Sequence, residues 1–204
     1  MVILGLTGSI AMGKSTAAGF FRYLGVPVHD SDAEVHKLLG PKGAAVAAVE
    51  AAFPGVMKDG AIDRPALGAR VFGKPDELRK LERILHPLIG ESRDNFVRRH
   101  ARRGAPVVVY DIPLLFEVGA DGLCDAVVVV SAPAYLQRQR ALRRPGMNEE
   151  RLRSILARQM PDAQKRGRAD FVVPSGLGRA ETLRQIRAVV AVAKLMSGRH
   201  WPPR

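Results

Sequence analysis

The sequence predicts an α/β protein built on an open, mostly parallel β-sheet, and two patterns support this prediction. Short continuous apolar runs rich in β-branched residues occur at Val2–Leu6, Val26–Val28, Pro106–Tyr110, Ala126–Val130 and Phe171–Val173. Continuous runs, unlike alternating ones, are typical of strands that are buried on both faces. Helical patterns separate the runs, at Lys14–Leu24, Pro75–Arg102, Pro133–Arg144, Glu149–Met160 and Arg179–Met196. This alternation of strand and helix favours a parallel sheet covered by helices.

The first strand and the first helix are joined by a glycine-rich segment, GSIAMGKS, that begins at Gly8. It matches the pattern G-x-x-x-x-G-K-[ST], in which backbone N–H groups and a helix N-terminus bind phosphate oxygens. A glycine-rich turn without a ligand is the alternative, but the flanking strand and helix supply the context that the pattern requires. In such a P-loop the lysine reaches the β- and γ-phosphates and the last hydroxyl binds Mg²⁺. The residues expected to contact the nucleotide are Gly8, Ala11, Met12, Gly13, Lys14, Ser15 and Thr16, with Ser15 on the metal.

The second strand is followed by two carboxylates, Asp30 and Asp32, at the edge of the sheet where phosphates would lie. A carboxylate at this place can take a proton from an attacking hydroxyl or hold metal-bound water. The alternative is that Asp30 or Ser31 only caps the helix that starts near Ala33. Because two carboxylates exceed what a cap needs, we expect one to be catalytic, and we favour Asp32 because Asp30 is nearer the strand.

The interval from about Asp32 to Arg103 contains helix-like pieces and turn signals but no convincing strand. We therefore expect a helical insertion between the second and third strands. Insertions at the carboxyl ends of parallel strands are where α/β folds place substrate-specific residues. His86 lies before Pro87 within an apolar helical pattern, and spacing alone indicates a structural histidine.

The third strand ends in Asp111, which is the Walker-B arrangement that can support Mg²⁺. A strand followed by aspartate is common, so this signal gains weight only beside the P-loop. The apolar residues of the next segment, Pro113 to Phe116, are expected in the core, and Glu117 follows them.

Arginines gather on the next two predicted helices. Such runs are often solvated helix faces, but like charges at helical spacing cost stability. The alternative is a lid that closes arginines over a transferring phosphate, and the P-loop favours it. The residues are Arg138, Arg140, Arg143, Arg144, Arg151, Arg153 and Arg158.

The amino-acid composition limits the kinds of molecule that the protein is expected to bind and the compartment in which it is expected to act. The 204 residues include 32 Lys and Arg against 20 Asp and Glu, a net charge of +12, which implies an anionic partner such as a nucleotide, a nucleic acid or a membrane surface. The lone Cys124 gives neither a disulfide framework nor zinc spacing. Apolar runs are too short to span a bilayer, and no targeting segment is visible, so we expect a cytoplasmic protein.

These segments together resemble the dephospho-CoA kinase family, relatives of the nucleoside-monophosphate kinases. The resemblance rests on the P-loop, on Asp30-Ser31-Asp32, on the segments Asp59–Arg64 and Leu81–Pro87, and on further segments in family order: Asp111–Glu117, Arg140–Gln159 and Ala169-Asp170. It implies a P-loop kinase three-layer fold with a five-stranded parallel sheet, a helical substrate-binding insertion and an Arg-rich lid. The implied parts of the single domain are a core of about 1–31, 104–132 and 166–204, a CoA-binding region of about 32–103 and a lid of about 133–165.

The resemblance also implies a reaction and its residues. ATP would phosphorylate the ribose 3′-hydroxyl of dephospho-CoA, with Mg²⁺ accompanying ATP and supported by Ser15 and, through water, by Asp111. Asp32 would be the base and a substrate contact, Lys14 and Arg140 would be catalytic, and His86 and Arg64 would bind dephospho-CoA. The sequence departs from the usual family pattern in two places: Ser9 and Ala11 replace P-loop glycines, and Pro174-Ser175 replaces an expected asparagine.

Two other functions share some of these features. A kinase for another small acceptor, such as a nucleoside monophosphate, would lack the insertion with its His86-Pro87 segment. A nucleic-acid-binding NTPase would explain the charge, but the sequence has no helix-turn-helix pattern, and aromatics make up only 5%. We expect no nucleic-acid or membrane partner, and a monomer or a weak homo-oligomer.

Overall fold

The computed structural model describes residues 1–202 and divides into two compact units. The first unit comprises Met1–His29 and the chain from His100 onwards, and the second comprises Asp30–Arg99. Each has its own hydrophobic core.

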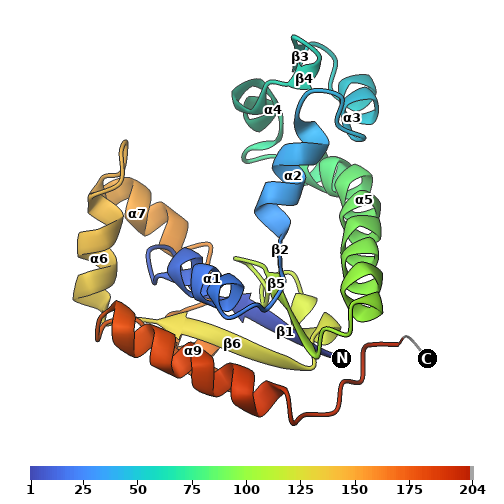
Figure 1. The fold of residues 1–204 in the computed structure, drawn as a ribbon. Coiled ribbons are helices and arrows are strands. Elements are labelled where there is room, and N and C mark those ends of the chain that lie inside the picture. The colour runs from blue at the N-terminus through green and yellow to red at the C-terminus, as the bar shows by residue number, and fades with distance from the viewer. Residues whose placement is uncertain (203–204) are drawn as a thin grey trace. The chain divides into compact units, whose positions relative to one another are not determined.

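A five-stranded sheet organises the first unit, with the strand order β2-β5-β1-β6-β7 (Figure 1). The pairs β1–β5, β1–β6 and β6–β7 are all parallel. The strands are β1 (Val2–Thr7), β2 (Val28–Asp30), β5 (Val107–Asp111), β6 (Ala126–Ser131) and β7 (Phe171–Pro174). This arrangement confirms the predicted α/β class and its parallel sheet.

Helices follow the strands of this unit as the alternation predicted. They are α1 (Lys14–Tyr23), α6 (Ala134–Leu142), α7 (Glu149–Leu156), α8 (Asp162–Gly167) and α9 (Arg179–Ala193). The helix predicted to run to Met160 ends at Leu156, and α8 follows it as a separate short helix. Pro161 lies between them, and a proline disfavours helical backbone in the residue before it.

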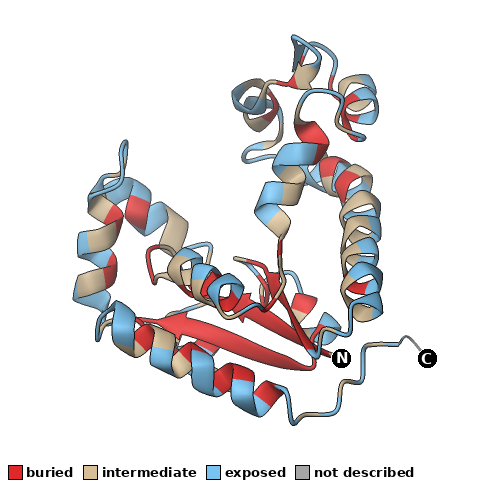
Figure 2. Ribbon diagram, in the orientation of Figure 1, coloured by how far each residue is buried: buried red, intermediate tan, exposed pale blue. Residues whose placement is uncertain are grey.

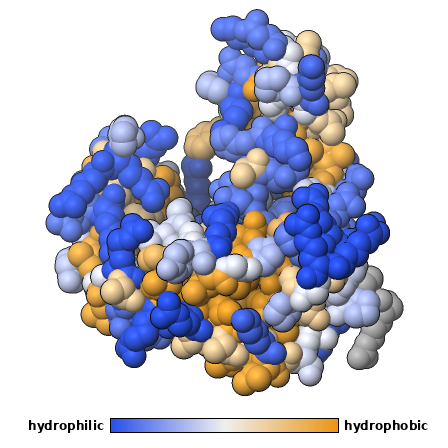
Figure 3. Space-filling model, in the orientation of Figure 1, coloured by the Kyte–Doolittle hydropathy of each residue, from blue (hydrophilic) through white to orange (hydrophobic). Residues whose placement is uncertain are grey.

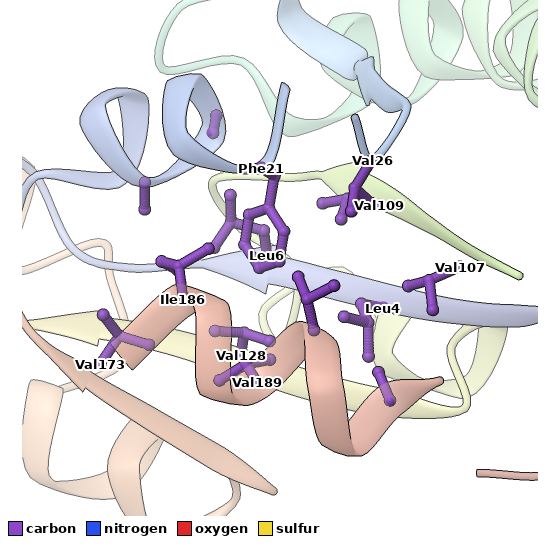
Figure 4. Close-up of a cluster of buried hydrophobic side chains, with 14 of the residues drawn as sticks. Leu4, Leu6, Phe21, Val26, Val107, Val109, Val128, Val173, Ile186 and Val189 are labelled. Carbon is purple, nitrogen blue, oxygen red and sulfur yellow. The ribbon is translucent and has the colours of Figure 1, made fainter. Parts of the chain in front are cut away.

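The core of the first unit lies between one face of the sheet and the helices α1 and α9. Alternate residues of β1, such as Leu4 and Leu6, meet Phe21 of α1 and Ile186 of α9, and all four side chains are buried (Figure 4). The central strands are buried throughout their length, whereas the helices are buried on one side only (Figure 2). Burial on both faces explains why these strands are continuous apolar runs in the sequence.

Helices dominate the second unit: α2 (Ser31–Leu39), α3 (Val46–Ala52), α4 (Arg64–Val71) and α5 (Pro75–Arg102). The prediction that this interval contains no strand was wrong, because β3 (Met57–Lys58) and β4 (Ala61–Ile62) form an antiparallel hairpin. Its two turn residues, Asp59 and Gly60, have φ angles of 50° and 77°. An Asp-Gly pair with both φ angles positive is the preferred two-residue hairpin turn.

The segment after α9 is hydrogen-bonded to the residue that precedes β6. The backbone N–H groups of Arg199 and His200 donate to Oδ1 of Asp125, at 2.5 and 3.3 Å. The other oxygen of Asp125 accepts from the N–H of Ile3 at 2.7 Å. Residues 203–204 lie outside the described range. Among residues 1–202, no helix has the length and apolarity needed to cross a membrane.

Candidate active site

The P-loop joins β1 to α1, and close packing explains its glycines. A Cβ on Gly8 would lie 2.7 Å from the carbonyl oxygen of Val130, so only glycine lets the loop pass β6 this closely. Gly13 precedes α1 with φ 94°, in the left-handed region that glycine adopts without strain. The first N–H groups of α1 therefore follow directly on the loop, which is the geometry that binds phosphate.

Ala11 is the unusual residue of this loop. It replaces a glycine of the usual pattern, yet its φ angle is 61°. Left-handed backbone costs a residue with a Cβ about 1–2 kcal/mol, so surrounding contacts must hold it. Its buried side chain packs in an apolar cluster with Ala141 of α6 and Leu152 of α7. The loop and these two helices are therefore packed together through this methyl group.

Lys14 and Asp111 form an ion pair between the loop and the end of β5. Lys14 Nζ lies 2.5 Å from Asp111 Oδ1, and the side chains are 17% and 4% exposed. The residues are 97 positions apart, but parallel pairing of β1 with β5 puts their C-terminal ends side by side. The lysine of the phosphate-binding motif and the Walker-B aspartate thus meet within one unit.

Ser15 and Thr16 occupy the first turn of α1, and Ser15 is exposed. Its hydroxyl and the Asp111 carboxylate are hard oxygen donors of the kind that Mg²⁺ prefers. Mg²⁺ is usually held by one or two such side chains together with substrate phosphates. These two residues fit that description.

Arg140 lies on α6 and reaches the loop that follows β7. Its Nη1 donates to Ser175 Oγ at 3.0 Å and its Nη2 to the Ser175 carbonyl oxygen at 2.9 Å. The Ser175 hydroxyl in turn donates to the carbonyl oxygen of Met12 in the P-loop, at 2.6 Å. The serine found in place of the expected asparagine therefore connects this arginine to the P-loop.

Two other predicted lid arginines contact residues of the α6–α7 region itself. Arg138 pairs with Glu149, and Arg151 Nη1 donates to the Gly146 carbonyl oxygen at 3.1 Å. Hydrophilic residues predominate on the surface over α6 and α7 (Figure 3). Arg140, by contrast, contacts Ser175, whose hydroxyl donates to the P-loop carbonyl of Met12.

The second unit contains the remaining predicted site residues. Asp30 Oδ1 accepts from the N–H of Ala33 at 3.0 Å and caps α2, so the capping alternative is confirmed for this aspartate. Asp32 lies in the first turn of the same helix. On α4, the Arg64 guanidinium contacts the ring of His36, with 2.6 Å between Nη1 and Nε2. His36 was not among the site residues predicted from the sequence. His86 is exposed on α5, next to the internal Pro87.

A comparison with protein families matches residues 2–178 to the model described as dephospho-CoA kinase. The chain belongs to the dephospho-CoA kinase family. A curated dephospho-CoA kinase from Paramagnetospirillum magneticum is 59% identical over 194 residues, which is 95% of this chain and 92% of the relative. The resemblance inferred from the motifs is confirmed, and the family's reaction is the ATP-dependent conversion of dephospho-CoA to coenzyme A, the last step of coenzyme A synthesis.

Solved structures agree on the fold. A protein from Thermus thermophilus, described as TT1252, is 34% identical with a TM-score of 0.81, covering 97% of this chain and 98% of that one. A dephospho-CoA kinase from Campylobacter jejuni has a TM-score of 0.63 at 24% identity, covering 94% and 96% of the two chains. The five-stranded parallel sheet is thus that of the P-loop kinases.

The sequence did not indicate two residues that contact the P-loop of this family member, or a third residue that holds the backbone beside one of them. Gln137 and Gln159 hydrogen-bond to Ile10 of the P-loop, and Glu117 holds the residue next to Gln159. Burial alone would raise the pKa of Glu117, but the Lys165 ammonium and the Met160 N–H outweigh it and hold the pKa below its ordinary value. The segment of Glu117 was recognised in the sequence, but nothing local in it indicates these partners.

Proposed function

We propose that this chain phosphorylates the ribose 3′-hydroxyl of dephospho-CoA by in-line transfer of the γ-phosphoryl group of ATP. The observation that carries the proposal is the contact between Lys14 of the P-loop and Asp111 at the end of β5. Phosphoryl transfer needs little covalent chemistry from the protein, so positioning and charge neutralisation supply most of the catalysis.

In this proposal the P-loop holds the ATP phosphates. The backbone N–H groups between Gly8 and Thr16 and the N-terminus of α1 would bind the phosphate oxygens. Lys14 would exchange its contact with Asp111 for the β- and γ-phosphates. Ser15 would hold Mg²⁺ directly and Asp111 would hold it through water, and the bound ion would neutralise phosphate charge.

The second unit would bind the acceptor. Asp32 is the proposed base, because it lies two residues after β2 and is not the carboxylate that caps α2. Arg64 and His86 are proposed contacts for dephospho-CoA. An arginine fork suits its phosphates, and the Arg64 guanidinium is already oriented by His36.

We propose that the chain has three functional parts. Residues of about 1–31, 104–132 and 166–204 form the core, residues of about 32–103 form the CoA-binding region, and residues of about 133–165 form a lid that bears Arg140. The protein acts in the cytoplasm as a monomer or a weak homo-oligomer. Its basic charge serves ATP and dephospho-CoA, both of which carry linked phosphates.

The function is tested by measuring ADP release in a coupled assay. Dephospho-CoA should give turnover well above AMP, shikimate and duplex DNA, each supplied at the same concentration with ATP and Mg²⁺. Product analysis should find the new phosphate on the ribose 3′-oxygen. Faster turnover with AMP or shikimate would make the protein a kinase of another acceptor, and stimulation by DNA would favour a nucleic-acid-dependent NTPase.

Arg140 gives a second test. An arginine that meets charge as the γ-phosphoryl group leaves stabilises the transition state, so its loss should appear in kcat. Arg140→Ala should lower kcat and kcat/KM together by about 10³-fold or somewhat less, since related arginines contribute about 10³–10⁵ and neighbours can partly substitute. ATP affinity should change little, and Arg140→Lys should recover little, because lysine lacks the bidentate fork.

The matched control is Arg138→Ala, which removes an arginine from the same helix. Its side chain is 63% exposed and pairs with Glu149, so turnover should stay close to that of the unmodified protein. Steady-state kinetics and ATP titration compare the variants. A raised KM for ATP with unchanged kcat in Arg140→Ala would make Arg140 a ground-state anchor.

A further inference from the structure

Ile10, inside the P-loop, has both of its backbone polar groups held by glutamine side chains. Its N–H donates to Gln159 Oε1 at 3.0 Å, and its carbonyl oxygen accepts from Gln137 Nε2 at 3.0 Å. The glutamines lie 149 and 127 positions along the chain from Ile10, one after α7 and the other on α6. The peptide groups on either side of Ile10 are therefore oriented from outside the loop.

The backbone determines which end of each glutamine amide faces Ile10. A backbone N–H needs an acceptor and a carbonyl oxygen needs a donor, so Gln159 must present its oxygen and Gln137 its nitrogen. Gln137 is only 8% exposed, which leaves little water to replace the bond. Loss of either bond would leave a partly buried polar group of the loop without this partner.

The backbone next to Gln159 is held by an ion pair between Glu117 and Lys165. Glu117 Oε1 accepts from the N–H of Met160, the residue after Gln159, at 2.8 Å. The same oxygen lies 2.8 Å from Lys165 Nζ, and the Lys165 side chain is fully buried. A carboxylate paired with a buried ammonium is held in one place, so the backbone next to Gln159 is held as well.

Apolar contacts tie the same two regions together. Ile10 and Ala11 pack in one cluster with Ala141, Leu152 and residues nearby. The contacts fix the strained backbone of Ala11, and the glutamines fix the peptide groups that precede it. Hydrogen bonds and packing thus act on adjacent residues of the P-loop.

We propose that Gln137 and Gln159 are positioning residues for phosphate binding: by holding Ile10 from both sides, they orient the P-loop N–H groups toward the ATP phosphates, and Glu117 anchors Gln159 in this role. Neither glutamine needs to touch the nucleotide. The proposal rests on the proposed role of the P-loop in ATP binding. It does not depend on which acceptor is phosphorylated.

The test compares two pairs of variants, with ATP itself as the probe. Gln137→Leu and Gln159→Leu remove a hydrogen bond at nearly constant size, and each should weaken ATP binding about tenfold. Gln159→Glu keeps the acceptor, whereas Gln137→Glu sets carboxylate oxygens against the Ile10 carbonyl oxygen. Both Glu variants add the same charge near Ile10, so a difference between them reports the lost hydrogen bond and not the charge. Gln137→Glu should therefore bind ATP at least fivefold more weakly than Gln159→Glu.

The measurements are ATP dissociation constants by calorimetry, steady-state kinetics and the dephospho-CoA dissociation constant. Gln139→Leu, an exposed glutamine of α6, is the matched control and should bind ATP normally. A purely structural role would lower the unfolding temperature of the Leu variants and leave ATP affinity within twofold of the unmodified protein. That result, or equal ATP affinities in the two Glu variants, would overturn the proposal.

Glu117 is tested in the same way. Glu117→Gln retains an oxygen that can accept from Met160 but removes the charge that faces Lys165, so it should weaken ATP binding less than Gln159→Leu does. Equal or greater weakening would show that Glu117 does not act through Gln159. Absence of dephospho-CoA turnover in the unmodified protein would refute the proposed function, but ATP calorimetry would still decide the role of the glutamines.

Discussion

Replacing Lys14 by methionine is expected to abolish measurable turnover and to weaken ATP binding. The ammonium is proposed to contact the transferring phosphate. Loss of one neutral charge-stabilising donor already costs about 10²–10³ in kcat, and Lys14 also supplies a full positive charge, so a larger loss is expected. Here the same change also leaves the buried Asp111 carboxylate without its 2.5 Å partner. Steady-state kinetics with dephospho-CoA and ATP titration by calorimetry measure both effects.

Two controls separate catalysis from stability in this variant. Lys194→Met removes an exposed lysine after α9 and should leave kcat unchanged. Thermal unfolding of Lys14→Met should show a loss of stability of about 1.5–3 kcal/mol, the usual net contribution of one hydrogen bond to a charged group. A folded Lys14→Met protein with near-normal kcat would remove Lys14 from the mechanism.

Replacing Asp32 by asparagine is expected to lower kcat by about 10²–10⁴-fold, which is the usual contribution of a positioned base. Asparagine has nearly the same shape but cannot accept the proton of the ribose hydroxyl. ATP binding should stay close to normal, because Asp32 is not among the residues proposed to hold the nucleotide. Single-turnover rates and ATP calorimetry check the two halves of this prediction.

Asp30→Asn is the matched control for Asp32. Asn caps a helix as well as Asp does, so the bond from the Ala33 N–H should be kept and kcat should change little. If Asp30→Asn loses turnover and Asp32→Asn does not, Asp30 is the base. If neither variant loses turnover, Asp111 becomes the next candidate.

The elements of the fold followed from patterns that are local in the sequence. α5 begins and ends where predicted, at Pro75 and Arg102, and the strands deviate from their predicted bounds by one or two residues. The hairpin of β3 and β4 was missed because two-residue strands are too short to show a hydrophobic period. The Asp59-Gly60 turn was the local sequence feature that indicated this hairpin.

Only part of the candidate site could be predicted from local sequence patterns. The P-loop could be recognised because its chemistry depends on backbone N–H groups, glycines and one lysine that are contiguous in the chain. Asp30 and Asp32 remained alternatives for the catalytic carboxylate because the sequence does not say whether the Asp30 side chain turns back to the helix N-terminus. The structure assigns the cap to Asp30.

The sequence alone determined the fold class, the P-loop and the family resemblance, because each depends on residue type and short-range spacing. Only the tertiary structure decided that Lys14 meets Asp111, that Ser175 joins Arg140 to the P-loop, and that Gln137 and Gln159 hold Ile10. These partners lie from 35 to 163 positions apart. A glutamine has the same polarity wherever it points, so its partner is determined by which distant backbone group the packing brings within hydrogen-bond distance.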